Sequence, residues 1–183
     1  AKNLGAYGDA GMVTTNNESD ARRLRMLVNH GRETKYEHKI LGYNYRMDAL
    51  QAGILSVKLQ HLADWTEARR RLAHRYNELL KGLPLLTPAE KFHHVYHLYV
   101  VQCDNRDELQ RALKSEGIAT GIHYPIPLHL QPCFRDLLPG AGKGHLPITE
   151  KIVSKILSLP MFPELTEAQQ DRITEIICQF YNS

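Results

Sequence analysis

Residues 48–80 carry the pattern that most restricts the fold of this 183-residue chain. Apolar side chains recur there at steps of three and four residues, which is typical of one amphipathic helix from about Asp48 to Leu80, ended by Gly82 and Pro84. At about 1.5 Å per residue, such a helix would be roughly 50 Å long. A small domain is narrower than that, so we expect the helix to bridge two domains or to pack against a second subunit.

Shorter elements are expected on both sides of this helix. Alternating or continuous apolar runs predict strands over residues 8–15, 95–101, 118–122 and 158–162. Capping and stop residues predict helices over residues 16–31, 105–117, 148–157 and 166–183. Residues 32–44 and the Pro-rich residues 124–147 are expected to be loops.

These elements divide the chain unevenly. Residues 83–183 make a complete α+β unit, and residues 48–82 hold the long interdomain or interface helix. Residues 1–47 offer one strand and one helix, which cannot bury both faces of a sheet. We therefore expect residues 1–47 to be the C-terminal remnant of a larger α/β domain.

Composition excludes several classes of function. A net charge of +3 is too weak and too dispersed for a nucleic-acid binder. The basic cluster at residues 69–71 is expected to be a solvated helix face, with a partner site as the alternative. No apolar run approaches the about 20 residues that a membrane span needs. No signal peptide and no initiator Met are visible, so we expect a trimmed chain or a piece of a longer protein.

Cysteine and histidine usage points away from metal binding. Three isolated cysteines suit a reducing compartment, which favours a cytoplasmic location. His93 and His97 would share one face of a strand while His94 faces the other way, and neither Cys nor a carboxylate completes a ligand set. We therefore predict that the protein holds no metal.

Lys2 is the residue with the clearest chemical potential. It enters a run of small and turn-forming residues, 2–11, and a lysine so placed can form a Schiff base with a carbonyl cofactor inside a packed pocket. Only Ala1 precedes it, so half of such a pocket would have to come from sequence outside this chain. The alternative is a solvated lysine at a frayed terminus.

Five sequence runs, in order, now point to one family. They are residues 2–11, 42–52, 96–100, 121–132 and 157–160. Together they make the chain resemble the C-terminal half of the DegT/DnrJ/StrS family of sugar aminotransferases, over essentially its whole length. The resemblance implies an α/β fold of the aspartate aminotransferase-like type I class, with a remnant of the large pyridoxal 5'-phosphate (PLP) binding domain followed by a complete small domain. It also implies PLP as cofactor, glutamate and a nucleotide-linked keto-sugar as substrates, and a cytoplasmic homodimer.

The same resemblance implies roles for individual residues. Lys2 matches the lysine that binds PLP covalently and carries a proton between substrate and cofactor. Asn44 matches a residue that reaches the cofactor phosphate of the neighbouring subunit, with a simple turn residue as the alternative. Arg46 is a candidate clamp for a substrate carboxylate or phosphate, with a salt bridge across the interface as the alternative.

Three further candidates come from the Pro-rich loop. His123, Tyr124 and His129 lie where the resemblance places the active-site mouth. The histidines could transfer a proton or bind a carboxylate, and Tyr124 could serve the substrate or the structure. In the family the carboxylate on the pyridine nitrogen, the main phosphate-binding turn and the ring that covers the cofactor all lie before the lysine.

Two functions therefore remain open. The first is transamination by an enzyme of which this chain is the C-terminal part, the isolated chain being inactive. The second is a non-catalytic dimerising or interaction module derived from the same family. Self-association without PLP-dependent absorbance would favour the module.

Overall fold

The computed structural model describes residues 2–134, 137, 140 and 142–182. Contacts between Cα atoms divide the chain into two compact units, a first unit of Ala1–Ala63 and a second unit of Asp64–Ser183. Within the described residues, no helix combines the length and the hydropathy that a membrane span requires.

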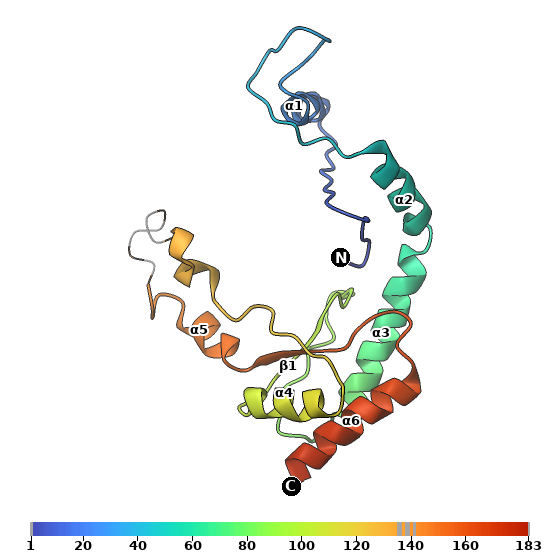
Figure 1. Ribbon diagram of the computed structural model, residues 1–183, viewed down its shortest axis with the longest axis vertical. Coiled ribbons are helices and arrows are strands. Elements are labelled where there is room, and N and C mark those ends of the chain that lie inside the picture. Colours follow the sequence, from blue (N-terminus) through green and yellow to red (C-terminus); the bar gives the residue numbers. More distant parts are fainter. Residues whose placement is uncertain (1, 135–136, 138–139, 141, 183) are drawn as a thin grey trace. The chain divides into compact units, whose positions relative to one another are not determined.

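The first unit contains helices α1 (Glu18–Val28) and α2 (Ala49–Leu59), visible in Figure 1. Helix α1 begins as predicted, because Asn17 Oδ1 accepts hydrogen bonds from the backbone N–H groups of Ser19 at 2.9 Å and Asp20 at 3.2 Å. Gly5 and Gly31 are the only buried residues among those described in this unit. The first unit therefore has no apolar core of its own.

The strand predicted over residues 8–15 is wrong. These residues are irregular and exposed, and among the described residues they pair with no other segment. A strand needs a neighbour to accept its N–H groups and to donate to its carbonyls. With no such neighbour, water satisfies those groups and the apolar alternation alone does not make a strand.

The single helix predicted over residues 48–80 is interrupted. Helix α2 ends at Leu59, and helix α3 spans Leu62–Leu79. Between them the N–H groups of Gln60 and His61 bond to carbonyls only three residues back, at 3.3 and 3.0 Å. This is a tighter turn than the α-helix allows. Neither Gly nor Pro stands there, so the sequence carries no stop signal at this point.

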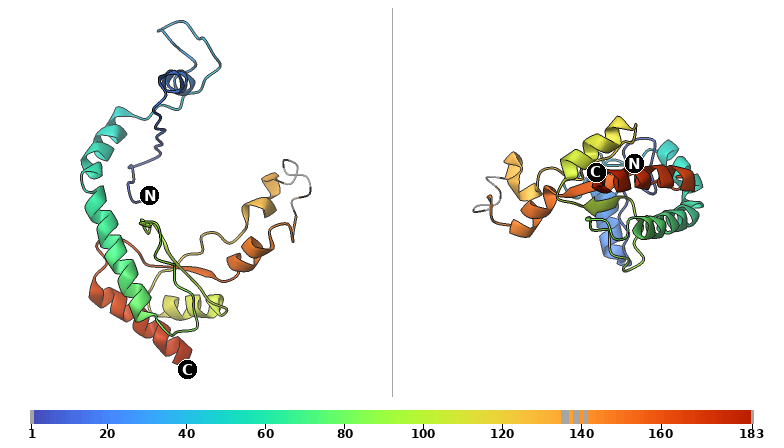
Figure 2. Two further views of the ribbon diagram at one scale, coloured as in Figure 1. Left: turned by 180° about the vertical axis from the view of Figure 1, so that it is seen from behind. Right: turned by 90° about the horizontal axis from the view of Figure 1, so that it is seen from below.

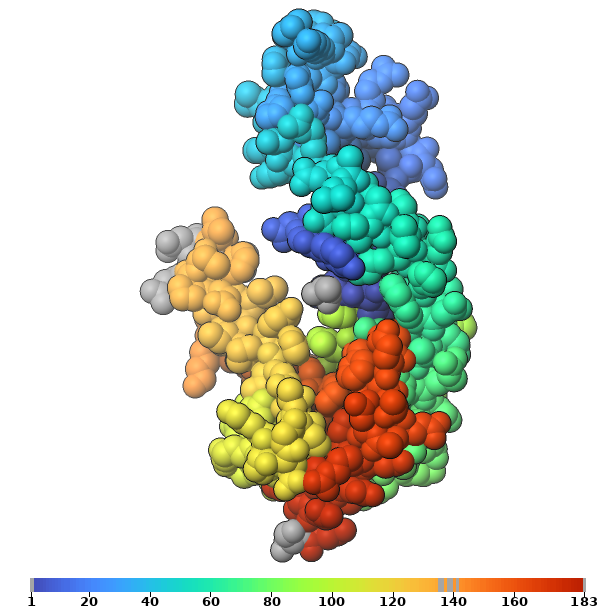
Figure 3. All heavy atoms as spheres, turned by 45° about the vertical axis from the view of Figure 1, so that its right-hand side comes forward, coloured from blue at the N-terminus to red at the C-terminus, as the bar shows by residue number. Residues whose placement is uncertain are grey.

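The second unit is built on a two-stranded antiparallel sheet. Strand β1 (Tyr99–Gln102) pairs with β2 (Ile156–Leu159), with Tyr99 opposite Leu159. Helices α3, α4 (Arg106–Ser115) and α6 (Glu167–Asn182) lie next to this pair, as Figure 2 shows. Helices α4 and α6 also contact each other directly, and their surfaces adjoin in Figure 3.

One apolar core holds these elements together. Its fully buried side chains come from α3, β1, α4, β2 and α6, and the largest are Tyr76, Tyr99, Leu80, Leu109, Leu113, Leu157 and Ile177. Helix α6 buries Ile173, Ile176 and Ile177, and Phe180 packs against the edge of the core. The second unit therefore has the apolar core that the first unit lacks.

Several element boundaries in this unit differ from prediction, three of them at β2 or the segments next to it. The strand expected over residues 118–122 is reduced to one bridge between Gly121 and Ser158. The helix expected over residues 148–157 is the shorter α5 (Pro147–Val153), and the following strand begins at Ile156 rather than residue 158. All four residues of β2 are buried and only Ser158 is polar, so this short run cannot be told from a helix by its periodicity.

The loop predicted over residues 124–147 is largely confirmed. Its described residues contain two short 3₁₀ turns, η1 (Leu128–Leu130) and η2 (Pro132–Phe134). Residues 135, 136, 138, 139 and 141 lie outside the described residues. The predicted loop over residues 32–44 is also confirmed, with isolated bridges only.

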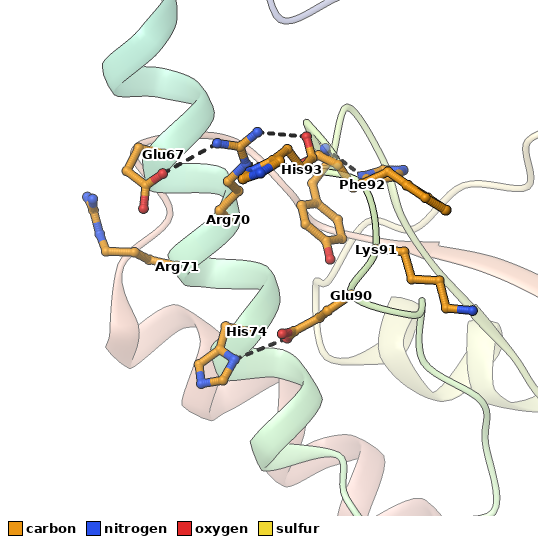
Figure 4. A pocket seen from close by; sticks show the side chains of 10 residues that line it. Glu67, Arg70, Arg71, His74, Glu90, Lys91, Phe92 and His93 are labelled. Atoms are coloured by element: carbon orange, nitrogen blue, oxygen red, sulfur yellow. Dashed lines mark hydrogen bonds and ion pairs between the residues drawn. The ribbon is translucent and has the colours of Figure 1, made fainter.

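Arg69 and Arg70 explain why β1 begins at Tyr99 instead of residue 95. The guanidinium of Arg69 donates to the carbonyls of Tyr96 at 3.1 Å and Met161 at 2.9 Å, and that of Arg70 donates to His93 and His94. Figure 4 shows Arg70 held between Glu67 and the backbone of His93. These side chains occupy carbonyls that a strand partner would otherwise use. The prediction of a solvated face is thus wrong for Arg69, which is 8% exposed.

Two predicted capping boxes behave differently. At α6 the box is complete, because Gln169 N donates to Thr166 Oγ1 at 3.2 Å and Thr166 N donates to Gln169 Oε1 at 3.0 Å. At α4 the helix begins after Asn105 as predicted, but the Asn105 side chain makes no capping hydrogen bond. The same sequence signal therefore has different energetic weight at the two helices.

This difference predicts unequal costs of substitution. Thr166→Ala should lower the free energy of unfolding of the second unit by about 1 kcal/mol, because it removes a cap that is made. Asn105→Ala should change it by less than about half of that, since no cap bond is lost. Both free energies can be measured by urea unfolding monitored by circular dichroism. Equal losses in the two variants would show that the side-chain cap at Thr166 contributes no stability of its own.

The buried arginine gives a second prediction. Arg69→Met should destabilise the second unit by about 3 kcal/mol, because buried carbonyls lose a charged donor. Arg71→Met, at an exposed position on the same helix, is the matched control and should cost less than about 0.5 kcal/mol. If Arg69→Met lowers the free energy of unfolding no more than Arg71→Met does, the hydrogen bonds of Arg69 contribute nothing to stability.

Candidate active site

The segment that follows Lys2 is held by helix α2. Gln51 Oε1 accepts a hydrogen bond from Tyr7 N at 2.8 Å, and Lys58 Nζ donates to the carbonyl of Gly5. The same ammonium lies 5.4 Å from the centre of the Tyr7 ring, within range of a cation–π contact. Lys2 itself is exposed. Helix α2 thus fixes the run next to Lys2 and leaves the lysine side chain accessible.

Asn44 is held at the C-terminal end of α1. The last carbonyls of that helix, on Leu27 and Val28, accept from Tyr43 N at 2.7 Å and Tyr45 N at 2.9 Å. Tyr43 and Tyr45 stack with their ring centres 4.9 Å apart. Because alternate side chains of an extended segment share a face, Asn44 points to the opposite side from this stacked pair.

A close crossing of backbone supports this arrangement. Gly31 has a φ of +74°, and its N–H donates to the carbonyl of Met26 at 2.7 Å. A Cβ at Gly31 would lie 1.7 Å from the carbonyl oxygen of Ile40. Only glycine therefore lets the loop return over the end of α1 and bring Asn44 into place.

Arg46 lies on the same face as Asn44. Its Nε donates to Asn44 Oδ1 at 3.1 Å, and its Nη1 donates to Asn29 Oδ1 at 3.3 Å. Asn29 Oδ1 also accepts from Arg32 Nη2 at 2.7 Å. Sequence reasoning did not single out Asn29 or Arg32, and the only signal for them was their place in a polar stretch just after a helix.

The segment after Lys2 runs along α2, with Tyr7 bound at Gln51 in the first turn and Gly5 bound at Lys58 in the last. Asn44 precedes Ala49, where the helix begins. At about 1.5 Å per residue, the Ala49 and Lys58 positions are on the order of 13 Å apart along the axis. Lys2 and Asn44 are therefore attached to the first unit through different helices, α2 and α1.

His123 is anchored to the sheet of the second unit. Its Nδ1 lies 2.9 Å from Ser158 Oγ, and Ser158 is part of β2. A Cβ at Gly121 would lie 2.5 Å from His123 Cε1, so glycine there is required by the ring. Tyr124 packs edge-on against His123 with ring centres 5.5 Å apart, and both side chains are exposed.

His129 lies in a more closed environment. It is buried, and its Nε2 is 3.0 Å from Glu150 Oε1. Glu150 also accepts from Gly144 N at 2.9 Å and Leu146 N at 3.3 Å. Hydrogen bonds from Gly144 and then from His129 hold the pKa of the Glu150 carboxyl below its ordinary value. His129 and the backbone N–H groups of Gly144 and Leu146 thus bind the same carboxylate, and we call this group of contacts the Glu150 latch.

No group of three or more His, Cys, Asp or Glu side chains able to hold a metal ion occurs in the part of the chain that the structure describes. The donors present are instead an amine, amides, guanidinium groups and imidazoles. Such a set suits an organic cofactor that carries a carbonyl and a phosphate, since an amine can attack the carbonyl and amides and guanidiniums bind phosphate oxygens.

Comparison with known proteins now decides the family. Residues 1–178 match the DegT/DnrJ/EryC1/StrS aminotransferase family. The chain belongs to this family of PLP-dependent aminotransferases. The resemblance seen in the sequence is thereby confirmed.

Two relatives illustrate the range of the family. The chain is 51% identical to a "pleiotropic regulatory protein" of Geobacillus stearothermophilus, covering 98% of this chain and 49% of the relative. It is 46% identical to UDP-N-acetyl-3-dehydro-alpha-D-glucosamine 3-aminotransferase of Acidithiobacillus ferrooxidans, covering 97% and 47%. The chain therefore spans about half the length of the curated relatives it matches.

Solved structures confirm the fold class. DesV of S. venezuelae, in complex with a ketimine intermediate, matches with a TM-score of 0.93 and 38% identity over 99% of this chain and 49% of that chain. NtdA of Bacillus subtilis, with bound cofactor PMP, matches with a TM-score of 0.90 and 30% identity over 99% and 44%. The predicted α/β fold of a PLP-dependent transferase is thus correct.

The latch on Glu150 predicts a pH dependence. Because the pKa of Glu150 is lower in the folded chain than in an unfolded one, its stabilising effect is present above the ordinary Glu pKa of about 4.3 and is lost as the pH falls through the folded value. Amide protection at Gly144 and Leu146, measured by hydrogen exchange, should fall as the pH drops below the ordinary Glu pKa. Glu150→Gln should remove this dependence and exposed Glu175→Gln should keep it; an unchanged profile in Glu150→Gln would refute the latch.

Proposed function

We propose that the protein transfers an amino group from glutamate to a keto-sugar carried on a nucleotide, using PLP, and that this chain supplies the part of the enzyme with Lys2 and Asn44. The observation that carries the proposal is the placement of these two residues in the first unit. The segment beside Lys2 is fixed on α2, and Asn44 is fixed on the end of α1, in a chain that matches an aminotransferase family throughout.

Each residue has a distinct chemical role in this proposal. When bound, PLP supplies the electron sink that makes the substrate carbon acidic. The amine of Lys2 binds the cofactor covalently and afterwards moves the proton at that carbon. Asn44 donates from Nδ2 to the cofactor phosphate, because Nδ2 is its only side-chain donor, while its Oδ1 accepts from Arg46.

Arg46 and the second unit serve the substrate. Arg46 keeps donors beyond those bound to Asn29 and Asn44, and these suit a substrate phosphate or carboxylate. His123 and Tyr124 are exposed on the anchored start of the loop, where they bind or orient the sugar. His129 acts indirectly, by holding the loop through Glu150.

The proposed enzyme is a homodimer. Lys2 and Asn44 are attached through different helices of the first unit, and, as the family resemblance implies, we propose that Asn44 serves the cofactor bound to Lys2 of a second copy. Exposed apolar side chains in the first unit support association, among them Met12 at 76% and Tyr45 at 70% exposure. They line a groove of about 890 Å³ that residues 9–15, α1 and residues 45–47 share.

The proposal keeps the predicted domain division and location. Residues 1–47 belong to the large domain, residues 48–82 form the interdomain and interface segment, and residues 83–183 form the small domain. The three free cysteines accord with a cytoplasmic enzyme. Because the chain spans about half of its relatives, we propose that the chain alone is inactive and that the remaining cofactor contacts come from outside it.

The test is complementation followed by spectroscopy. The purified chain is mixed with PLP, alone and together with the part of the Geobacillus relative that the chain does not match. We expect a visible absorption band that borohydride abolishes only in the mixture, because the pocket around Lys2 is then complete. Lys2→Ala should remove this band, whereas Lys35→Ala, at an exposed position in the same unit, should keep it.

Other outcomes would decide against the proposal. A band that persists in Lys2→Ala would be an adduct of surface lysines and would refute the role of Lys2. Self-association of the chain with no Lys2-dependent band in the mixture would favour the non-catalytic dimerising module instead.

A further inference from the structure

Asn29 is shared by two arginines of the first unit. Its Oδ1 accepts from Arg32 Nη2 at 2.7 Å and from Arg46 Nη1 at 3.3 Å, and Arg46 Nε then donates to Asn44 Oδ1 at 3.1 Å. A continuous chain of hydrogen bonds thus links Asn29 to Asn44 through Arg46. The amide of Asn44 is thereby oriented with its oxygen toward Arg46 and its NH2 group away from it.

The two arginines give this network a net positive charge. Among the residues that the structure describes, neither Arg32 nor Arg46 forms an ion pair with a carboxylate. Asn29 is a neutral acceptor, so it fixes the two guanidiniums without cancelling their charge. Two fixed and uncompensated positive charges beside an amide donor attract an anionic oxygen, above all that of a phosphate.

The end of helix α1 fixes the position of Asn29 beside the two arginines. It is the C-terminal cap of α1, its N–H donates to the carbonyl of Met26 at 3.0 Å, and it forms a bridge with Asn44. Its backbone position is therefore set by the same contacts that place Asn44. The side chain is left to organise the arginines, since the backbone N–H alone makes the cap bond.

We propose that Asn29 is a positioning residue for phosphate binding, which holds Arg46 and Arg32 and, through Arg46, turns the Asn44 NH2 group toward the phosphate. This inference rests on the proposed function for the identity of the phosphate, as that of PLP, and it has Arg46 attract this phosphate in addition to its proposed role toward the substrate. It adds two residues, Asn29 and Arg32, to the site and assigns Asn29 a role that requires an uncharged acceptor.

The requirement for an uncharged acceptor at residue 29 makes the inference testable. Asn29→Asp keeps an oxygen that accepts from both guanidiniums but adds a negative charge beside them. A purely structural role would tolerate this change, because the hydrogen bonds persist. The proposed role would not, because the carboxylate neutralises the charge that attracts the phosphate.

The experiment is a titration of the full chain with inorganic phosphate, followed by NMR of the Asn44 side-chain NH2 and the Arg46 Nε–H. In the wild-type chain both signals should shift on titration. Asn29→Asp should leave the Arg46 Nε–H signal ordered but weaken phosphate binding about tenfold. Asn29→Ala should broaden that signal and weaken binding as well, since Arg46 loses its anchor.

Asn16→Asp is the matched control, because it makes the same change of charge at an exposed position in the same unit. It should bind phosphate as the wild type does. Equal affinity in Asn29→Asp and wild type would overturn the inference, and so would an Asn44 signal that ignores phosphate. If the Lys2-dependent absorption band does not form but phosphate shifts the NMR signals as expected, the proposed function is refuted and the inference about Asn29 is kept.

Discussion

The C-terminal end of helix α1 must find donors for its last carbonyl groups, and the first unit depends on how it does so. Tyr43 and Tyr45 supply those donors from their backbone N–H groups. The residue between them, Asn44, is therefore fixed on the opposite face from the two stacked rings. Because the first unit has no apolar core, these backbone hydrogen bonds, rather than side-chain packing, fix the position of Asn44.

The second unit achieves order by a different route. Apolar side chains from three helices and two strands make a continuous core, and Arg69 ties two irregular segments to it through their carbonyls. The sheet then carries His123 by way of Ser158. A side chain anchored to a buried strand is held more precisely than one on a free loop.

The contrast between the units bears on function. Lys2 and Asn44 lie in the unit that is stabilised by hydrogen bonds and has an exposed apolar groove. Such a unit gains stability from any surface that covers it. The family relationship and the half-length coverage of relatives agree with a site assembled from more than one piece of polypeptide. Binding of cofactor and completion of the fold would then be coupled.

The sequence alone determined the family, the fold class and most helix starts, because runs such as residues 42–52 and caps such as Asn17 and Thr166 act through local chemistry. It also drew attention to Asn44 and Arg46. It could not show that Asn29 joins them, since a hydrogen bond across 17 residues leaves no local pattern.

Tertiary structure alone decided where strands form, where the long helix breaks and which arginine is buried. Residues 8–15 alternate like a strand but have no partner, whereas Ile156–Leu159 pairs with β1 and becomes one. Arg69 and Arg71 are equivalent in sequence, yet only Arg69 faces carbonyls that need a donor. The physical reason is the same in each case: a backbone group or a charge is satisfied by whatever segment the fold brings beside it, and periodicity along the chain does not specify that segment.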